Sequence, residues 1–292
     1  MASRFYTQFY TWKSHDIHYI KRGWDEPLVL VHNLYAGASH EEFERNIDAL
    51  SRHFTVYAID LLGFGLSDAP HIRYTANTYK TLVHDFLVNV VQQPAHLLAA
   101  GLSCAYIADV AVWRPHLVRS LTMICPRSEP TTSNLPKWIA AIRHFLISSP
   151  TIGSGYYETL SSDWEIHSFL QQCFANPKRH ITREKISRMV EHAGRPGSAY
   201  PYASLVTGYL DTDLLKTLPH VHQPTLLIWG AQARPTPVEH SVRLHALLRR
   251  GRLDVVEAAG SWPHDEQSRV VNELIEAFVT NVDQTIQNVE SA

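Results

Sequence analysis

Residue types that nucleophilic catalysis requires occur in two short runs of the chain. Ser103 lies in GLSCA, residues 101–105, which matches a relaxed form of the G-x-S-x-G turn that presents a nucleophilic serine. His264 lies in GSWPHDE, residues 260–266, next to two carboxylates. A serine hydroxyl is a weak nucleophile until an imidazole takes its proton and an acid orients that imidazole. Ser103 and His264 would support an esterase-like acyl transfer if the fold brings them together.

Cysteine and histidine spacing predicts neither a metal centre nor a disulfide framework. The 3 cysteines are odd in number and contain no CxxC pair. The tightest histidine pair, His220 and His222, precedes Pro224 in a predicted linker. The run GFG at residues 63–65 follows a predicted strand but does not form a phosphate-cradling motif. We therefore expect no metal and no cofactor.

The composition is that of an ordinary globular protein: 292 residues, 45% hydrophobic and 18% charged. A net charge of −2 and a pI near 6.8 give no basic surface for nucleic acid or an anionic membrane. Mean hydropathy is −0.17, and no apolar run approaches the roughly 18 residues of a membrane helix. The first residues contain no apolar core of signal-peptide length. We expect a cytoplasmic protein with no nucleic-acid partner and no membrane span, of undetermined oligomeric state.

The elements that must position these residues alternate between strand and helix. Apolar, β-rich runs separated by helical stretches indicate βαβ units and a parallel sheet. We expect strands at 16–22, 27–32, 54–60, 96–100, 119–125, 225–229 and 253–257, with helices at 43–53, 79–91, 102–113, 238–249 and 266–282. The sequence thus predicts an α/β fold, a mostly parallel central sheet flanked by helices.

The alternation is interrupted in the middle of the chain. Between residues 127 and 222 no strand-like run stands out, and amphipathic stretches occur at 136–147, 164–174, 183–193 and 202–214. We therefore divide the chain into a core domain of residues 1–126 and 223–292 and a helical insertion of residues 127–222. Ligands of open α/β sheets bind outside the carboxyl ends of the strands, so an insertion there would roof a pocket.

The motifs of this frame resemble a known family. The runs PLVLVHN, VYAIDLLGFGLSD, HLLAAGLSCAYIADVAVWRPHLVRSL, PTLLIWGAQARPTPVEH and VVEAAGSWPHDE occur in this order between about residues 19 and 279. They resemble the α/β-hydrolase family in its subclass with a helical cap. The resemblance implies a serine nucleophile in a sharp strand-to-helix turn, followed along the chain by an acid and a histidine.

The resemblance allows two alignments of the nucleophile position, and the first of them places it at Gly101. In the family this residue follows the strand-opening histidine by about five positions and precedes the proline after the next helix by about fourteen. His96 and Pro115 both assign that position to Gly101, which leaves the nucleophile absent. A shift of two residues assigns it to Ser103. That shift keeps the strand alternation but turns the helix face by roughly 200°.

The resemblance also implies substitutions at the acid and base positions. The family motif W-G-x-x-D ends here at Ala233, and the motif G-H-x-P-H-x-E has Ser261 in place of its first, catalytic histidine. His264 corresponds to the second histidine, which is usually structural in the family. Glu129 or Asp265 would have to act as the acid if Ser103 and His264 form a displaced site.

The loop after the strand 27–32 carries a further departure from the family. His32-Asn33 stands where a His-Gly pair is common and where a backbone N–H helps to form the oxyanion hole. The Asn33 amide would either bind a carbonyl or hydroxyl of a ligand or be satisfied within its own turn. We expect the ligand pocket to be lined by His32, Asn33, Gly101, Leu102, Ser261 and Trp262. Tyr156, Tyr157, Trp164 and Tyr209 would either add aromatic walls or pack within the cap.

Three hypotheses for the function follow. The leading one is an α/β-hydrolase-fold protein with a degenerate triad, Gly101, Ala233 and Ser261, which binds a hydrophobic small molecule or performs chemistry that needs no triad. The alternative is an esterase-like hydrolase with a displaced site that uses Ser103 and His264. A third is an interaction protein in which large side chains fill the space beneath the cap.

Overall fold

The computed structural model describes residues 7–128, 137–149 and 153–290. Its centre is an eight-stranded sheet in the order β1-β2-β4-β3-β5-β6-β7-β8. The strands are β1 (Thr7–Trp12), β2 (His15–Arg22), β3 (Pro27–Val31), β4 (Thr55–Ile59), β5 (Ala95–Ala100), β6 (Val118–Ile124), β7 (Thr225–Gly230) and β8 (Gly251–Val256). β2 runs antiparallel to β1 and β4, and the pairs from β4 to β8 are parallel. The predicted fold class is confirmed.

Burial explains why most of the strands could be predicted from the sequence whereas β1 could not. Every residue of β3, β4, β5 and β7 is buried, so each strand is a short apolar run, as expected of a sheet covered on both faces. β1 lies at the edge of the sheet, and its residues alternate between exposed and partly buried up to Trp12, which is buried. The sequence analysis did not assign β1, because its polar alternation resembles that of a surface segment.

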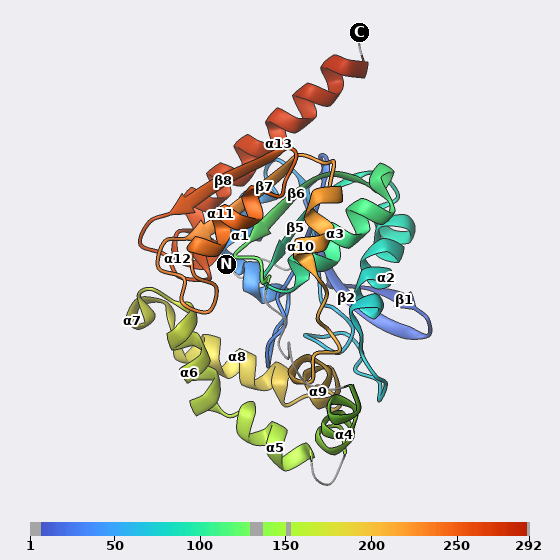
Figure 1. The fold of residues 1–292 in the computed structure, drawn as a ribbon, viewed down its shortest axis with the longest axis vertical. Coiled ribbons are helices and arrows are strands. Elements are labelled where there is room, and N and C mark those ends of the chain that lie inside the picture. Colours follow the sequence, from blue (N-terminus) through green and yellow to red (C-terminus); the bar gives the residue numbers. More distant parts are fainter. Residues whose placement is uncertain (1–6, 129–136, 150–152, 291–292) are drawn as a thin grey trace.

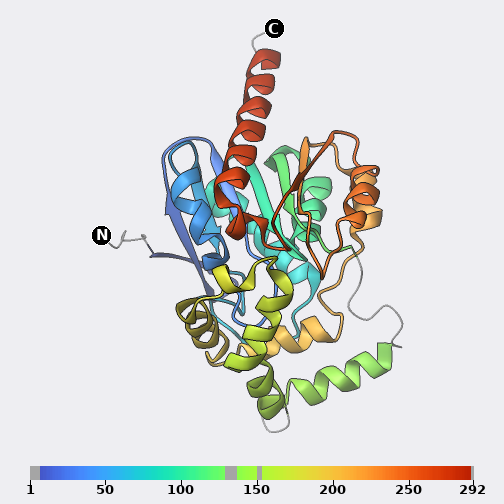
Figure 2. The same cartoon turned by 90° about the vertical axis from the view of Figure 1, so that its left-hand side faces the viewer.

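Helices cover both faces of the sheet. On one face α1 (Glu44–Leu50) packs against the C-terminal α13 (Ser268–Glu290), and on the other α2 (Ala76–Phe86) packs against α3 (Ser103–Trp113). α11 (Glu239–His245) lies on the same side as α3, whereas α13 extends beyond the body of the molecule (Figures 1 and 2). Within the described residues, no helix combines the length and apolar character needed to cross a bilayer.

The described chain between β6 and β7 contains helices and no strand. It forms α4 (Lys137–Ile147), α5 (Gly153–Leu160), α6 (Asp163–Cys173), α7 (Pro177–His180), α8 (Arg183–Ala193), α9 (Ala199–Val206) and α10 (Leu214–Thr217). α4 to α9 gather at one end of the sheet, below it in Figure 1. The helix expected at 202–214 has the wrong bounds, since α9 ends at Val206. Gly208, two residues later, adopts a φ of +78°, which a continuing helix does not allow.

Short polar contacts fasten this helical segment to the sheet. The carboxylate of Glu266, in α12 (Pro263–Glu266), accepts the backbone N–H groups of Gly260, Ala175 and Asn176 at 2.5, 3.1 and 3.0 Å. Arg188 of α8 pairs with Glu41 and Glu44, on the first helical turns after β3. The loop 260–266 is thereby held between β8 and the end of α6, at the carboxyl ends of the parallel strands.

Candidate functional site

The turn between β5 and α3 is sharp and centred on Gly101. Gly101 has a φ of +55°, in the left-handed region, and α3 begins two residues later at Ser103. The Gly101 N–H donates to the Ile124 carbonyl of β6 at 3.0 Å, which fixes the turn against the neighbouring strand. A residue with a side chain would be strained in this conformation.

The side chain of Asn33 occupies the space next to this turn. Its Oδ1 accepts the backbone N–H of Leu34 at 2.8 Å and that of Leu102 at 3.0 Å. A Cβ atom on Gly101 would lie 2.2 Å from Oδ1 and from Cγ of Asn33. Both N–H groups are therefore held by one amide oxygen, and the place of a side chain at position 101 is already filled.

Ser103 and His32 lie beneath this turn and are bonded within the protein. The Ser103 side chain is fully buried, and its hydroxyl donates to the His32 carbonyl at 2.6 Å. The His32 ring is equally buried; Nδ1 donates to the Asn33 carbonyl and Nε2 accepts the Leu61 N–H. Burial lowers the pKa of His32 to about 4, so the ring is neutral at physiological pH. Neither residue lines the adjoining cavity.

A cavity of about 330 Å³ opens between this turn and the helices above it. Of the residues predicted to line it, Asn33, Gly101, Leu102, Ser261 and Trp262 do so, and His32 does not. The remaining wall is formed by Leu34, Glu42, Ala100, Cys125, Arg127, Ser128, Phe169, Cys173, Pro235, Thr236 and His240. A larger hollow of about 680 Å³ lies beside α13, near the amino ends of β6 and β8, and contains none of the predicted site residues.

The aromatic residues predicted as cavity walls lie elsewhere. Trp164 is 74% exposed, Tyr157 is buried against Tyr202, and Tyr209 packs against His144. None of these three lines the 330 Å³ cavity, and the side chain of Tyr156 lies outside the described residues. Phe169 of α6 provides the aromatic wall instead, in contact with Trp262.

The positions predicted for acid and base lie on two loops at this end of the sheet. Ala233 is buried in the turn after β7, where its N–H donates to the Gly230 carbonyl. Ser261 faces the cavity, and its N–H donates to the Cys173 carbonyl at 2.7 Å. Its hydroxyl oxygen is buried and has no hydrogen-bond partner in the described part of the chain. Glu129 lies outside the described residues.

His264 and Asp265 lie deeper, under the loop that carries Ser261. The His264 ring is fully buried against Phe43 and Trp262, and burial lowers its pKa to about 4. Neither of its ring nitrogens has a hydrogen-bond partner among the described residues. Asp265 is ion-paired with Lys185 of α8 and Arg45 of α1. The structure thus brings Gly101 and Ser261 to one cavity, whereas Ser103 and His264 do not line it.

The sequence analysis missed Glu42, which lines the same cavity. It lies in a short 3₁₀ turn, His40–Phe43, and is 6% exposed. Its Oε2 accepts the Asn33 N–H at 2.7 Å, and its Oε1 lies 3.6 Å from His264 Nε2. Burial raises the pKa of Glu42 to about 8. A pair of glutamates at a helix start indicates a solvated turn, so only the burial of Glu42 marks it as unusual.

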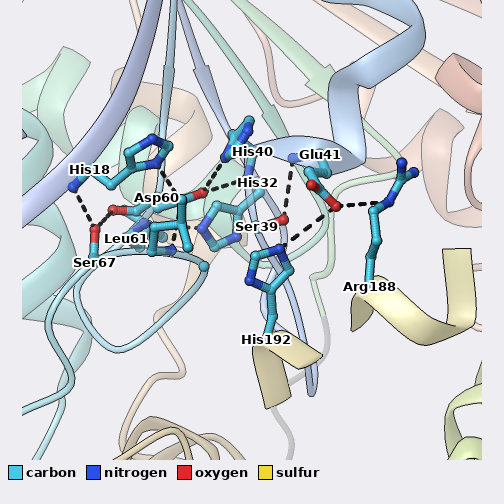
Figure 3. A network of polar contacts seen from close by, with 12 residues as sticks. His18, His32, Ser39, His40, Glu41, Asp60, Leu61, Ser67, Arg188 and His192 are labelled. Carbon is cyan, nitrogen blue, oxygen red and sulfur yellow. Dashed lines mark hydrogen bonds and ion pairs between the residues drawn. The ribbon is translucent and has the colours of Figure 1, made fainter. Parts of the chain in front are cut away.

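A second buried carboxylate, Asp60 after β4, has a different environment (Figure 3). Its oxygens accept His18 Nδ1 at 2.7 Å, His40 Nδ1 at 2.9 Å, and the backbone N–H groups of His40 and Leu66. Burial alone would raise the pKa of Asp60, but the two imidazoles outweigh it and hold that pKa well below its usual value. His18, His40 and Asp60 offer metal-ligand atoms, yet both Nδ1 atoms are engaged with the carboxylate.

Comparison with known proteins matches the chain to one family. Residues 26–268 match the family model for the alpha/beta hydrolase fold. A 2-hydroxy-6-oxo-2,4-heptadienoate hydrolase of Pseudomonas putida is 24% identical over 271 residues, covering 89% of this chain and 91% of the relative.

Solved structures agree at the level of the fold. A serine hydrolase involved in carbazole degradation superposes with a TM-score of 0.79 at 20% identity, covering 94% of this chain and 99% of the other. A 2-hydroxy-6-oxo-6-phenylhexa-2,4-dienoate hydrolase of Rhodococcus superposes with a TM-score of 0.76 at 16% identity, covering 95% and 99%.

Proposed function

This chain belongs to the alpha/beta hydrolase fold family, and we propose that it binds a small apolar molecule without hydrolysing it by a serine triad. In this proposal Gly101, Ala233 and Ser261 stand at the nucleophile, acid and base positions, and residues 127–222 form the cap. Loss of a triad nucleophile or base lowers turnover by about 10⁶-fold in a serine hydrolase.

The observation that carries the proposal is the hydrogen bonding of Asn33. In this family the oxyanion hole consists of the N–H after the nucleophile and an N–H from the loop after the third core strand. Leu102 and Leu34 supply these two groups here, and both already donate to Asn33 Oδ1. A substrate oxyanion would have to displace that oxygen, and no hydroxyl at position 101 would attack it.

The same geometry supports binding over a displaced esterase. Ser103 is fully buried, and its hydroxyl proton is directed at the His32 carbonyl rather than at a base. His264 is held between aromatic rings. The cavity, by contrast, has a size typical of sites for small ligands and combines apolar walls with a few polar atoms.

Fluorophosphonate labelling read by intact mass tests the loss of hydrolysis. We expect no adduct on the wild type, and p-nitrophenyl butyrate hydrolysis at background rates that are equal in wild type and Ser103→Ala. An adduct and turnover that both disappear in Ser103→Ala would overturn the proposal in favour of the displaced esterase.

Binding is tested separately with ethylbenzene, an uncharged aromatic probe that fits the cavity. We expect saturable amide shifts in protein NMR spectra at Leu34, Leu102 and Ser261, which are lost in Cys173→Phe because the larger side chain fills the cavity. Cys173 lines the cavity and is 3% exposed. Absence of saturable shifts in the wild type would contradict a binding function.

A further inference from the structure

Helix α4 exposes a row of large apolar side chains at the end of the molecule opposite the C-terminus (Figures 1 and 2). This α4 stripe consists of four side chains that are between 42% and 74% exposed: Trp138, Ile142, Phe145 and Leu146. With about 3.6 residues per turn, these positions fall within an arc of roughly 100° on one face of the helix. Single exposed apolar residues are ordinary, whereas a contiguous group on one face marks an interaction site.

The other side of α4 holds the helix on the protein. Of the side chains described in α4, only that of His144 is buried, and its Nε2 hydrogen-bonds the Ser204 hydroxyl of α9 at 3.0 Å. The His144 ring also packs edge-on against Tyr209. His144 lies roughly 150° around the helix from the centre of the stripe. The contacts that fix α4 therefore leave the stripe turned toward solvent.

The segments around α4 carry positive charge. Arg73 lies over the Tyr209 ring, and the Ala76 N–H donates to the Tyr209 carbonyl at 3.1 Å, so residues 69–76 lie against the chain that packs on α4. Residues 69–76, 137–149 and 199–210 contain no Asp or Glu, but they contain Arg73, Lys137 and Arg143. Arg143 is exposed and follows the stripe around the helix. The net charge of −2 for the whole chain thus conceals a local excess of positive charge.

The acidic residues that border these segments do not cancel that excess. Asp211 pairs with Arg127, and Asp68 accepts the Asp16 N–H at the start of β2. Glu158, on α5, is exposed and is the first acidic residue after α4 in the described chain. The α4 stripe is therefore an apolar face bordered by more cations than anions.

We propose that the α4 stripe docks this protein on the surface of a lipid bilayer that contains anionic headgroups. α4 has 11 residues, too few to span a bilayer, so it lies in the plane of the interface. Trp138 and Phe145 enter the boundary between headgroups and acyl chains, a place that tryptophan favours. Arg143 pairs with the headgroups. This docking goes beyond the proposed binding of a small molecule and does not depend on it.

A second copy of this chain fits the stripe less well than a bilayer does. In a two-fold dimer the same surface patch meets itself, so Arg143 and Arg73 would approach the same residues of the other copy. Like charges brought together across an interface are unfavourable, and α4 contains no acidic residue to pair with them. Anionic headgroups supply the missing negative charge.

Co-sedimentation of the full-length protein with lipid vesicles tests the proposal. We expect binding to vesicles of phosphatidylcholine mixed with phosphatidylserine, weaker binding to phosphatidylcholine alone, and a loss of this difference when salt is raised from about 0.1 M to about 1 M. The double variant Trp138→Ser/Phe145→Ser lowers the partition coefficient by about 100-fold, since each buried aromatic ring contributes about tenfold. Arg143→Gln lowers it by about fivefold on the mixed vesicles only.

Matched controls come from the other end of the sheet. Trp24 is 85% exposed between β2 and β3, and Arg250 is exposed just before β8. Trp24→Ser and Arg250→Gln remove the same kinds of side chain far from α4, so both variants bind vesicles as the wild type does. Urea midpoints equal to that of the wild type establish that each variant is folded.

Quenching of tryptophan fluorescence by brominated phosphatidylcholine in the mixed vesicles locates the contact. We expect quenching in the bound wild type that is reduced in Trp138→Phe and retained in Trp24→Phe, although both variants bind. The proposal is overturned if the mixed vesicles do not bind the protein, if they bind the double variant equally well, or if phosphatidylserine makes no difference. A dimer that sedimentation velocity detects and that the double variant dissociates would instead assign the stripe to contact between copies, which also overturns it.

Discussion

Asp60 and Glu42 are two buried carboxylates that follow neighbouring parallel strands, and their hydrogen-bond partners differ greatly. Asp60 accepts four donors, two imidazoles and two backbone N–H groups. Glu42 accepts the Asn33 N–H at 2.7 Å, and its Oε1 is buried 3.6 Å from His264 Nε2. Accordingly the pKa of Asp60 falls well below its usual value, whereas that of Glu42 rises to about 8.

The difference separates a carboxylate held in its charged form from one whose surroundings favour the neutral form. A buried carboxylate is stable when its oxygens are fully hydrogen-bonded. Asp60 meets that condition through donors from His18, His40 and Leu66. A buried carboxyl group that accepts too few hydrogen bonds becomes neutral instead. Its O–H group then needs a hydrogen-bond acceptor. Burial alone would not distinguish these two residues; the two imidazoles beside Asp60 do.

The largest effect is expected when the Asp60 network is broken. Asp60→Asn keeps the size but places an amide NH₂ against donors, so we expect the free energy of unfolding to fall by about 3 to 5 kcal/mol in urea titrations. Glu42→Gln, the matched change at the other carboxyl, should alter it by less than about 1 kcal/mol at pH 6.5. Similar losses in the two variants would remove the distinction drawn above.

The histidines beside the two carboxylates sharpen the contrast. His40 donates to Asp60, whereas neither nitrogen of His264 has a partner in the described chain. We expect His40→Leu to cost about 1.5 to 3 kcal/mol, because it removes a hydrogen bond to a charged group. His264→Leu should change stability by less than about 1 kcal/mol, since it removes polar atoms that are already unsatisfied. A larger loss in His264→Leu than in His40→Leu would contradict this ranking.

Stability between pH 6.5 and 8 tests the raised pKa of Glu42. The folded-state pKa of about 8 lies above the ordinary value of 4.5, so folding takes up a proton in this range and the stabilisation is lost as pH rises. The slope is at most about 1.4 kcal/mol per pH unit, or about 2 kcal/mol over the window. His32 and His264, whose pKa values are lowered from 6.5 to about 4 in the folded state, act in the opposite direction: they add stability as pH rises toward and just above 6.5, where their unfolded forms lose protons.

The control for this pH effect is Glu42→Gln measured over the same range. His40 has a raised pKa beside Asp60 and also loses stabilisation as pH increases. The expected result is therefore a difference in slope between wild type and Glu42→Gln, obtained from urea midpoints at constant ionic strength. Parallel curves would indicate that Glu42 is ionised throughout.

Within the Asp60 network, the smallest effect is expected at Ser67, which bonds to the Asp60 backbone and not to its carboxylate. Its hydroxyl donates to the Asp60 carbonyl at 2.6 Å and accepts the His18 N–H at 2.9 Å. Ser67→Ala should cost about 1 kcal/mol in the same titrations, since the carboxylate keeps its own four donors. A loss as large as that of Asp60→Asn would show that the network depends on this hydroxyl rather than on the carboxylate.

Much of the fold was predictable because its signals are local. The strands at 27–32 and 96–100 are short apolar runs, and α8 begins and ends where its amphipathic pattern predicts, at Arg183 and Ala193. β1 was missed because an edge strand with one solvated face lacks that apolar signal. The prediction of a helix at 202–214 was wrong because of Gly208. The spacing of apolar residues does not indicate its backbone conformation.

The candidate site was predictable in outline and not in its polar detail. Five of six predicted lining residues surround the cavity, because the ends of β3 and β5 must meet at one edge of a parallel sheet. The role of Asn33 depends on hydrogen bonds to Leu34 and Leu102, the second of them 69 residues away. Glu42 becomes visible only when the burial of its side chain is known.

The contact between Asn33 and position 101 makes the two residues epistatic. Gly101→Ser alone brings a side chain to within 2.2 Å of the Asn33 amide, and Asn33→Gly alone frees two N–H groups without providing a nucleophile. The effect of either substitution therefore depends on the residue at the other position. On the proposed assignment of the triad positions, directed evolution toward esterase activity has to vary Asn33 and Gly101 together, along with Ala233 and Ser261.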